Sequence, residues 1–220
     1  MTTVRRLDDA VFFAVNRFAE STPWLHGPVL GYAAYGMVLF AGLLLAALLI
    51  SRTGPSTRLA ATGWAAVATL GALGVNQVVG RVFAESRPYA AHPGILRLAD
   101  ATTDFSFPSD HAVMAGAVAA GLLLAHRRLG RLAVGAAGLM AFARVYIGAH
   151  YPWDVLAGLV LGAAVSVAGW LLLRRPLTAL TSWLRRLPVL RTAFPPPGGE
   201  TGGGGLHSGD AVAASLPARS

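Results

Sequence analysis

The sequence contains no cysteine and no lysine, and few charged residues of either sign. The lack of cysteine excludes disulfide frameworks, thiolate metal sites and cysteine nucleophiles. The lack of lysine makes all 18 basic residues arginines, whose fixed charge can hold an oxyanion through two parallel hydrogen bonds. Charged residues make up 13% of the 220 residues, against roughly 25% in soluble domains. This composition excludes a soluble globular protein.

Apolar residues are instead abundant and form long uncharged runs. They make up 55% of the chain, and the mean hydropathy is +0.56. Uncharged runs of about 18 residues or more are typical of membrane-spanning helices. We therefore predict an all-α, polytopic membrane protein with about five transmembrane helices. The predicted spans are 27–50, 59–80, 109–125, 132–149 and 155–173.

Two amphipathic segments flank the predicted transmembrane domain, which covers residues 27–173. Residues 1–26 combine charges with apolar side chains at helical spacing, which predicts an interfacial helix rather than a cleaved signal peptide. Residues 174–194 alternate arginine with leucine and tryptophan, which predicts a basic interfacial helix on an anionic leaflet. Residues 195–220 are rich in glycine and proline, and we predict that this tail is disordered.

The distribution of arginine predicts the orientation in the membrane. Arginines gather after the first, third and fifth predicted spans, and such turns face the cytoplasm. The long polar connection at 81–111 and the connection between the fourth and fifth spans then face outward. All candidate functional residues lie in or beside these two outer connections.

The first candidate cluster is RVFAESRP at residues 81–88. It contains Arg81 and Arg87, and the proline after Arg87 biases the chain out of helical geometry. Taken alone, Arg87 is equally typical of a membrane-flanking loop.

The second cluster is DFSFPSDH at residues 104–111, directly before an apolar helix. Ser109 suits a helix N-cap, and the free amides of Asp110 and His111 can bind an anion. Capping does not explain His111, because the helix dipole disfavours a protonated histidine in a first turn.

The third cluster is RVYIGAHYPWD at residues 144–154. Arg144 lies within a predicted span, where it either marks a functional site or extends to the interface. His150 and Asp154 are four residues apart, and Pro152 suits the first turn of a helix, so the carboxylate can reach the imidazole. Such a contact fixes the tautomer and activates the other ring nitrogen. Two ligands without a third make a poor metal site, so we expect no metal and no other cofactor.

Together these clusters supply two histidines, at least two arginines, a helix N-terminus and one carboxylate. This set suits a multiply charged oxyanion and the nucleophile, cations and acid of phosphoryl transfer. The outer connections contain no paired acidic cluster for a metal phosphatase, and Ser109 lacks the glycine-flanked elbow of a serine hydrolase.

The three clusters resemble, in order and spacing, the motifs of the type 2 phosphatidic acid phosphatase (PAP2) superfamily. The finer likeness, in FPSDH at 107–111 and RVYIGAHYP at 144–152, is to bacterial undecaprenyl-diphosphatases of the bacitracin-resistance type. The resemblance implies a metal-independent phosphatase with a phosphohistidine intermediate. The implied roles are His150 as nucleophile, Asp154 as its orienting partner, His111 as acid, and Arg87, Arg144, Ser109 and the amide of Asp110 as phosphate-binding groups.

The sequence departs from the broad family at three positions. Gly80 stands where the family has a lysine, and the neighbouring Arg81 is the candidate substitute, although one residue turns a helical side chain by about 100°. Asp110 replaces a glycine, as in the bacitracin-resistance type, and Ala143 replaces a serine.

The resemblance implies hydrolysis of undecaprenyl diphosphate to undecaprenyl phosphate on the outer face of the bacterial cytoplasmic membrane. The expected partners are the lipid substrate and the bilayer, with no nucleic acid; no oligomeric state is predicted. One alternative is another lipid phosphate, such as phosphatidylglycerol phosphate or a polyprenyl-phosphoryl sugar phosphate. The other is a non-catalytic lipid-phosphate carrier, which would not need His111, His150 and Asp154 together.

Overall fold

The structure is a computed structural model that describes residues 3–195. Within this range the chain forms helices and loops without strands, so the predicted all-α class is confirmed. The predicted disordered tail lies outside the described residues from residue 196 onward. The elements are α1 (Thr3–Ser21), η1 (Pro23–Leu25), α2 (His26–Ser51), α3 (Ser56–Phe83), α4 (Pro88–Ala91), α5 (Asp110–Ala125), α6 (Arg127–Tyr146), α7 (Pro152–Leu184) and α8 (Pro188–Arg191).

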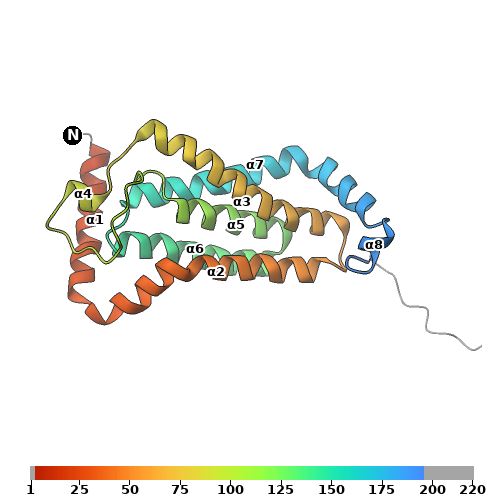
Figure 1. The fold of residues 1–220 in the computed structure, drawn as a ribbon, viewed down its shortest axis with the longest axis horizontal. Coiled ribbons are helices and arrows are strands. Elements are labelled where there is room, and N and C mark those ends of the chain that lie inside the picture. The colour runs from red at the N-terminus through yellow and green to blue at the C-terminus, as the bar shows by residue number, and fades with distance from the viewer. Residues whose placement is uncertain (1–2, 196–220) are drawn as a thin grey trace, which may run out of the picture.

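Five long helices run side by side and form a bundle, with α5 on the inside (Figure 1). α5 contacts α2, α3, α6 and α7, and half of its 16 residues are buried alanine, glycine and valine. Small side chains allow neighbouring helix backbones to approach closely where no water is present. A second set of buried residues, including Phe40, Leu122 and Met140, fills the space between α2, α5 and α6.

Within the described residues, four helical segments are long and apolar enough to cross a membrane. They are Pro23–Ser51, Ser56–Ala91, Arg127–Tyr146 and Pro152–Leu184. The remaining predicted span is the 16-residue α5, which is too short to rank with them by length. α5 is largely enclosed by the other helices, but Leu123 and Leu124 near its C-terminal end are each 40% exposed. The multi-pass architecture is thus confirmed, with a short inner helix among the five.

The close approach of α5 and α7 connects two of the three sequence clusters. A Cβ atom on Gly162 would collide with the backbone of Val113, and one on Gly158 would lie 2.9 Å from the carbonyl oxygen of Ser109. The amide of Ser109 also donates to the carbonyl of Asp154 at 3.2 Å. Backbone contact between these helices therefore sets where the second cluster lies relative to the third.

The helix boundaries differ from the prediction at two places. α7 does not end at Leu173 but continues through Pro176 to Leu184, so the separate helix predicted for 174–194 is reduced to the short α8. Arginine is a good helix former, and the two arginines at 174 and 175 do not interrupt the helix. α6 begins at Arg127 and ends at Tyr146, several residues before the predicted end at residue 149.

α1 lies across one end of the bundle (Figure 1). Phe12 and Ala19 are fully buried against the protein, whereas Leu7, Val11 and Phe18 on another face are 42% to 66% exposed. Asn16 joins α1 to the long outer loop: its side chain donates to the carbonyl of Leu96 at 2.8 Å and accepts from the amide of Leu96 at 3.2 Å. The two hydrogen bonds of Asn16 therefore attach the long outer loop to α1 at this end of the bundle.

Arg185 closes the opposite end of the bundle. Its guanidinium is almost fully buried and donates to the carbonyl oxygens of Gly54 at 2.7 Å and Arg52 at 2.9 Å, in the turn between α2 and α3. At the same end, Ser51 contacts His126 through a 2.6 Å hydrogen bond.

Candidate active site

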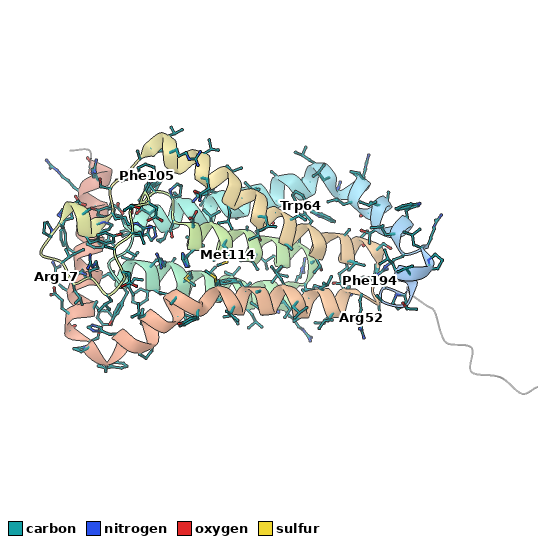
Figure 2. The ribbon with its side chains drawn as sticks, in the orientation of Figure 1. Arg17, Arg52, Trp64, Phe105, Met114 and Phe194 are labelled. Carbon is teal, nitrogen blue, oxygen red and sulfur yellow. The ribbon has the colours of Figure 1, made fainter. Side chains whose placement is uncertain are left out.

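A cavity of about 350 Å³ lies at the α1 end of the bundle. Phe105, which lines it, lies at the end opposite to Arg52 and Phe194 (Figure 2). The cavity brings together residues from all three sequence clusters. Arg87 and His150, for example, are 63 positions apart in the chain. Its polar lining is Arg87, Asp100, Thr102, Asp104, Asp110, His111, Arg144 and His150, and three residues of α2 (Leu30, Ala33 and Ala34) form part of its apolar side.

His150 is held by both of its ring nitrogens. Nδ1 lies 2.8 Å from the backbone carbonyl oxygen of Ser106, and Nε2 lies 3.2 Å from Nη1 of Arg87 and 3.4 Å from Nη2 of Arg144. A carbonyl oxygen can only accept a hydrogen bond, and a guanidinium can only donate. The proton of the neutral imidazole is therefore on Nδ1, and the lone pair of Nε2 faces the two arginines.

The turn between α6 and α7 places His150 in this position. Gly148 has a positive φ of 75°, and a Cβ atom there would lie 2.7 Å from the carbonyl oxygen of Leu96. The amide of Leu98 donates to the carbonyl of Ile147 at 3.1 Å. Only glycine meets both the left-handed conformation and the close contact without strain.

Asp154 contacts His150 differently from the predicted arrangement. His150 precedes α7 rather than lying on it, and the distance from its Nδ1 to Oδ2 of Asp154 is 3.6 Å. Oδ2 instead accepts hydrogen bonds from the hydroxyl of Ser106 at 2.5 Å and the amide of Tyr151 at 2.9 Å, the latter as part of a capping box. The direct partner of Nδ1 is thus the carbonyl of Ser106, a residue that the sequence analysis missed. Ser106 lies within the second cluster, but no motif marks it, because the carbonyl that contacts Nδ1 is a backbone group that every residue type has.

Arg87 is almost fully buried and spans the cavity. Besides His150, its Nη1 donates to the carbonyl of Ala149 at 3.0 Å, and its Nη2 forms a 2.9 Å ion pair with Asp104. Asp104 is the only one of these partners with a largely exposed side chain, at 59%. The guanidinium is therefore fixed on its inner side and paired with an exposed loop residue on its outer side.

Arg144 and His111 lie at helix ends that face the cavity. Arg144 is in the last turn of α6 rather than well within the predicted span 132–149, because α6 ends at Tyr146. A cation there interacts favourably with the helix dipole, which lowers the cost of burying it. His111 is in the first turn of α5, is half-buried and lines the same cavity as His150.

Ser109 and Asp110 are partly as predicted. Ser109 is the N-cap residue of α5, but its side chain makes no cap hydrogen bond, and its buried hydroxyl has no partner among the described residues. The carboxylate of Asp110 lines the cavity and accepts hydrogen bonds from the side-chain amides of Asn76 at 2.6 Å and Gln77 at 3.1 Å. α3 therefore fixes the start of α5.

Arg81 does not line the cavity that contains His150. It is an exposed residue in the last turn of α3, beside a second cavity of about 190 Å³. Asp104, Phe105, Pro108 and Asp110 line both cavities and separate Arg81 from His150.

The electrostatic surroundings keep His150 neutral. Complete burial, together with the positive charges of Arg144 and Arg87, lowers the pKa of His150 well below its usual value. Partial burial acts to raise the pKa of Asp104, but hydrogen bonding from Thr102 and the charge of Arg87 hold it below the usual carboxylate value. At neutral pH the cavity therefore combines an unprotonated imidazole nitrogen with an ionised carboxylate.

Within residues 3–195, no three His, Asp or Glu side chains are grouped so that they could hold a metal ion. The cavity lining contains two arginines and three aspartates. The carboxylates of Asp104 and Asp110 already accept hydrogen bonds from Arg87, Asn76 and Gln77, and the two guanidinium groups beside His150 suit an anionic ligand.

Comparison with known proteins gives one consistent result. The sequence profile of the PAP2 superfamily matches residues 61–176. Undecaprenyl-diphosphatase BcrC of Bacillus subtilis is 30% identical over 155 residues, which cover 70% of this chain and 78% of that protein. Bacitracin transport permease protein BcrC of Bacillus licheniformis is 31% identical over 135 residues, covering 61% of this chain and 66% of that protein. The fold is similar to the crystal structure of a PAP2-type phosphatidylglycerolphosphate phosphatase from Bacillus subtilis, with a TM-score of 0.57, 19% identity, and coverage of 85% of this chain and 90% of the other.

Proposed function

Because the chain belongs to the PAP2 superfamily, we propose that it hydrolyses undecaprenyl diphosphate to undecaprenyl phosphate through a phosphohistidine at His150. One observation carries the proposal: Nε2 of His150 faces the guanidinium groups of Arg87 and Arg144 in a cavity that also contains His111. The name of the Bacillus subtilis relative supports undecaprenyl diphosphate as the substrate.

His150 attacks the terminal phosphorus of the diphosphate through the lone pair of Nε2. An Nε2–P bond forms, and the bond from phosphorus to the bridging oxygen breaks. Arg87 and Arg144, which lie 3.2 Å and 3.4 Å from Nε2 without substrate, then donate to the phosphoryl oxygens and stabilise their charge in the transition state. The amide of Asp110, a residue that lines the cavity, is a further donor for these oxygens, and the unpartnered hydroxyl of the buried Ser109 lies next to it in the chain.

His111 completes both halves of the reaction. In the first half it donates a proton to the bridging oxygen, which leaves as undecaprenyl phosphate. In the second half it accepts a proton from the water that attacks the phosphohistidine, which releases inorganic phosphate and restores His150. Its position in the first turn of α5, on the wall of the same cavity, suits both steps.

Ser106 and Asp154 stabilise the positive charge that His150 gains on phosphorylation. Nδ1–H donates to the carbonyl of Ser106, and the carboxylate of Asp154 lies 3.6 Å from Nδ1. The Ser106 hydroxyl and the Tyr151 amide hold that carboxylate in place. Asp154 therefore acts by charge and by fixing its neighbours, rather than by a direct short hydrogen bond to the imidazole.

Two features support a lipid substrate at the outer face of the bacterial cytoplasmic membrane. The cavity is lined on one side by Leu30, Ala33 and Ala34 of the membrane-spanning α2, so an apolar chain can lie beside a phosphate group. The opposite end of the bundle has the arginine-rich turns after α2 and α5 and after α7, and such turns face the cytoplasm.

The test is phosphate release from undecaprenyl diphosphate in detergent with a chelator present. Compared with the wild type, His150→Ala should lower release by roughly a thousandfold or more. His126→Ala, which removes a histidine at the other end of the bundle, is the matched control and should retain activity. Equal release by the wild type and His150→Ala would eliminate the covalent mechanism. Release from phosphatidylglycerol phosphate but not from the prenyl diphosphate would replace the proposed substrate.

A further inference from the structure

The ion pair between Arg87 and Asp104 joins two residues of very different exposure. The side chain of Arg87 is 8% exposed and that of Asp104 is 59% exposed, and the atoms Nη2 and Oδ2 are 2.9 Å apart. Nη1 of Arg87 is directed to Ala149 and His150 in the interior. The carboxylate of Asp104 is thus an anion already bound to the outer nitrogen of a proposed phosphate-binding arginine.

A phosphoryl group between Arg87 and Arg144 would compete with that carboxylate. Both groups are anions that require the same donor, and their charges repel at close distance. Phosphate can therefore pair fully with Arg87 only when Asp104 leaves Nη2. Asp104 belongs to a loop rather than to a helix, and its exposed side chain can rotate without disturbing the core.

A second cation is available to Asp104 in the neighbouring cavity. Asp104 lines both the 350 Å³ cavity with His150 and the 190 Å³ cavity with Arg81. Arg81 is exposed and forms no ion pair among the described residues. The carboxylate of Asp104 therefore borders both the cavity of the buried Arg87 and the cavity of Arg81, which has no ion-pair partner within residues 3–195.

We propose that Asp104 is a displaceable counter-ion of Arg87 that moves to Arg81 when a phosphate group binds. This inference rests on the proposed function of the His150 cavity as a phosphate site. The displacement makes Asp104 a specificity-determining residue, because a bound anion must compete with its carboxylate for Arg87. The substrate diphosphate carries more charge than inorganic phosphate and competes better. The product phosphate is therefore released more easily than the substrate. Arg81 then acts through Asp104 rather than by contacting the phosphate.

The first test measures the dissociation constant of inorganic phosphate by equilibrium dialysis with the full chain in detergent. Asp104→Asn removes the competing charge and should lower this constant roughly threefold to tenfold. Asp100→Asn is the matched control, because Asp100 lines the same cavity and forms no ion pair among the described residues. An unchanged constant in Asp104→Asn, or an equal decrease in Asp100→Asn, would overturn the proposal.

The second test measures the effect of Arg81→Gln in the wild type and in the Asp104→Asn variant. Arg81→Gln should raise the dissociation constant about threefold when Asp104 is present, because the carboxylate then has no second partner. In the Asp104→Asn background the same change should have no effect. A similar loss in both backgrounds would mean that Arg81 contacts phosphate directly, and would overturn the proposed movement. Salt of about 0.15 M, with a Debye length of about 8 Å, limits the contribution of distant charges.

Kinetics provide a readout that a purely structural role would not change. Asp104→Asn should lower the KM for the prenyl diphosphate and make inhibition by inorganic phosphate stronger, with a smaller effect on kcat. Phosphate binding does not require turnover. Absence of prenyl diphosphate hydrolysis would therefore count against the proposed function, while the dialysis comparison would still decide the role of Asp104.

Discussion

The carbonyl oxygen of Ser106 lies 2.8 Å from Nδ1 of His150, while the hydroxyl of the same serine donates to Asp154. One residue therefore connects the imidazole to the carboxylate, through its backbone on one side and its side chain on the other. This arrangement fixes the tautomer that exposes the Nε2 lone pair, and it holds the carboxylate near the ring.

Ser106→Ala should lower kcat by about tenfold to a hundredfold with little change in KM. The variant retains the carbonyl and loses only the hydroxyl, so a buried hydrogen bond to a charged group worth about 1.5–3 kcal/mol disappears. Steady-state kinetics check this. Ser21→Ala is the control: it removes an exposed serine hydroxyl that forms a hydrogen bond within α1, and its kcat should equal that of the wild type. An unchanged kcat in Ser106→Ala would show that Asp154 does not need this contact.

Asp154→Asn should lower kcat by about a hundredfold or more while the fold is retained. The asparagine oxygen can still accept from the Ser106 hydroxyl and the Tyr151 amide, so the cap of α7 persists. Only the negative charge near Nδ1 of His150 is lost, and that charge stabilises the phosphorylated imidazole. The measurement is kcat together with the melting temperature. A large fall in the melting temperature would contradict a mainly electrostatic role.

The buried, neutral state of His150 should make the protein less stable in acid. Its folded pKa lies well below the usual value of about 6.5, so the unfolded chain binds a proton more readily. The stabilising contribution is complete above pH of about 6.5 and is lost as the pH falls toward the folded pKa. Melting temperatures between neutral and acidic pH should therefore fall more steeply for the wild type than for His150→Gln. Parallel curves would exclude this histidine as a source of the pH dependence.

Asn16→Ala should loosen the outer loop and lower activity. Two hydrogen bonds between Asn16 and the backbone of Leu96 are lost, at a cost of about 1–3 kcal/mol. The loop that carries Asp104 and Ser106 should then be cut faster in limited proteolysis, and kcat/KM should fall. Arg17→Ala alters the exposed neighbour on the same helix (Figure 2) and is the control. Equal cleavage rates for both variants would show that the hydrogen bonds of Asn16 do not hold the outer loop in place.

Gly162→Ala should destabilise the protein by about 1–3 kcal/mol, because the new methyl group collides with the backbone of Val113 and Ala117. α5 and α7 would have to separate, which also moves Ser109 away from Asp154. Gly71→Ala on α3 is the matched control: it has open space around it and should be neutral or slightly stabilising. Thermal unfolding in detergent distinguishes the two. Equal melting temperatures would mean that α5 and α7 are less closely packed than described.

The residues of the candidate site could be identified from the sequence, but their contacts and the helix ends could not. The three clusters carried unusual charges next to apolar runs, so Arg87, His111, Arg144 and His150 were all identified, and all four line one cavity. Ser106 was missed because its contact with His150 uses a backbone carbonyl that any residue type supplies, and because its hydroxyl meets Asp154 from 48 positions away in the chain. The end of α6 was placed three residues too late because the hydrophobic pattern continues through the turn after Tyr146, where Gly148 ends the helical geometry.

The sequence by itself determined that the protein lies in a membrane, because long uncharged runs are typical of membrane-spanning helices. It also determined that the site binds an anion, because clustered arginine and histidine side chains bind anions. It did not determine which groups touch. The tertiary structure decided that Asp154 reaches His150 through Ser106, that Asp104 occupies Arg87, and that Arg81 faces a separate cavity. The physical reason is that these contacts join residues up to 48 positions apart, most of which lie in the loops between helices. Their distances depend on how closely α5 and α7 approach, and no local pattern encodes that approach.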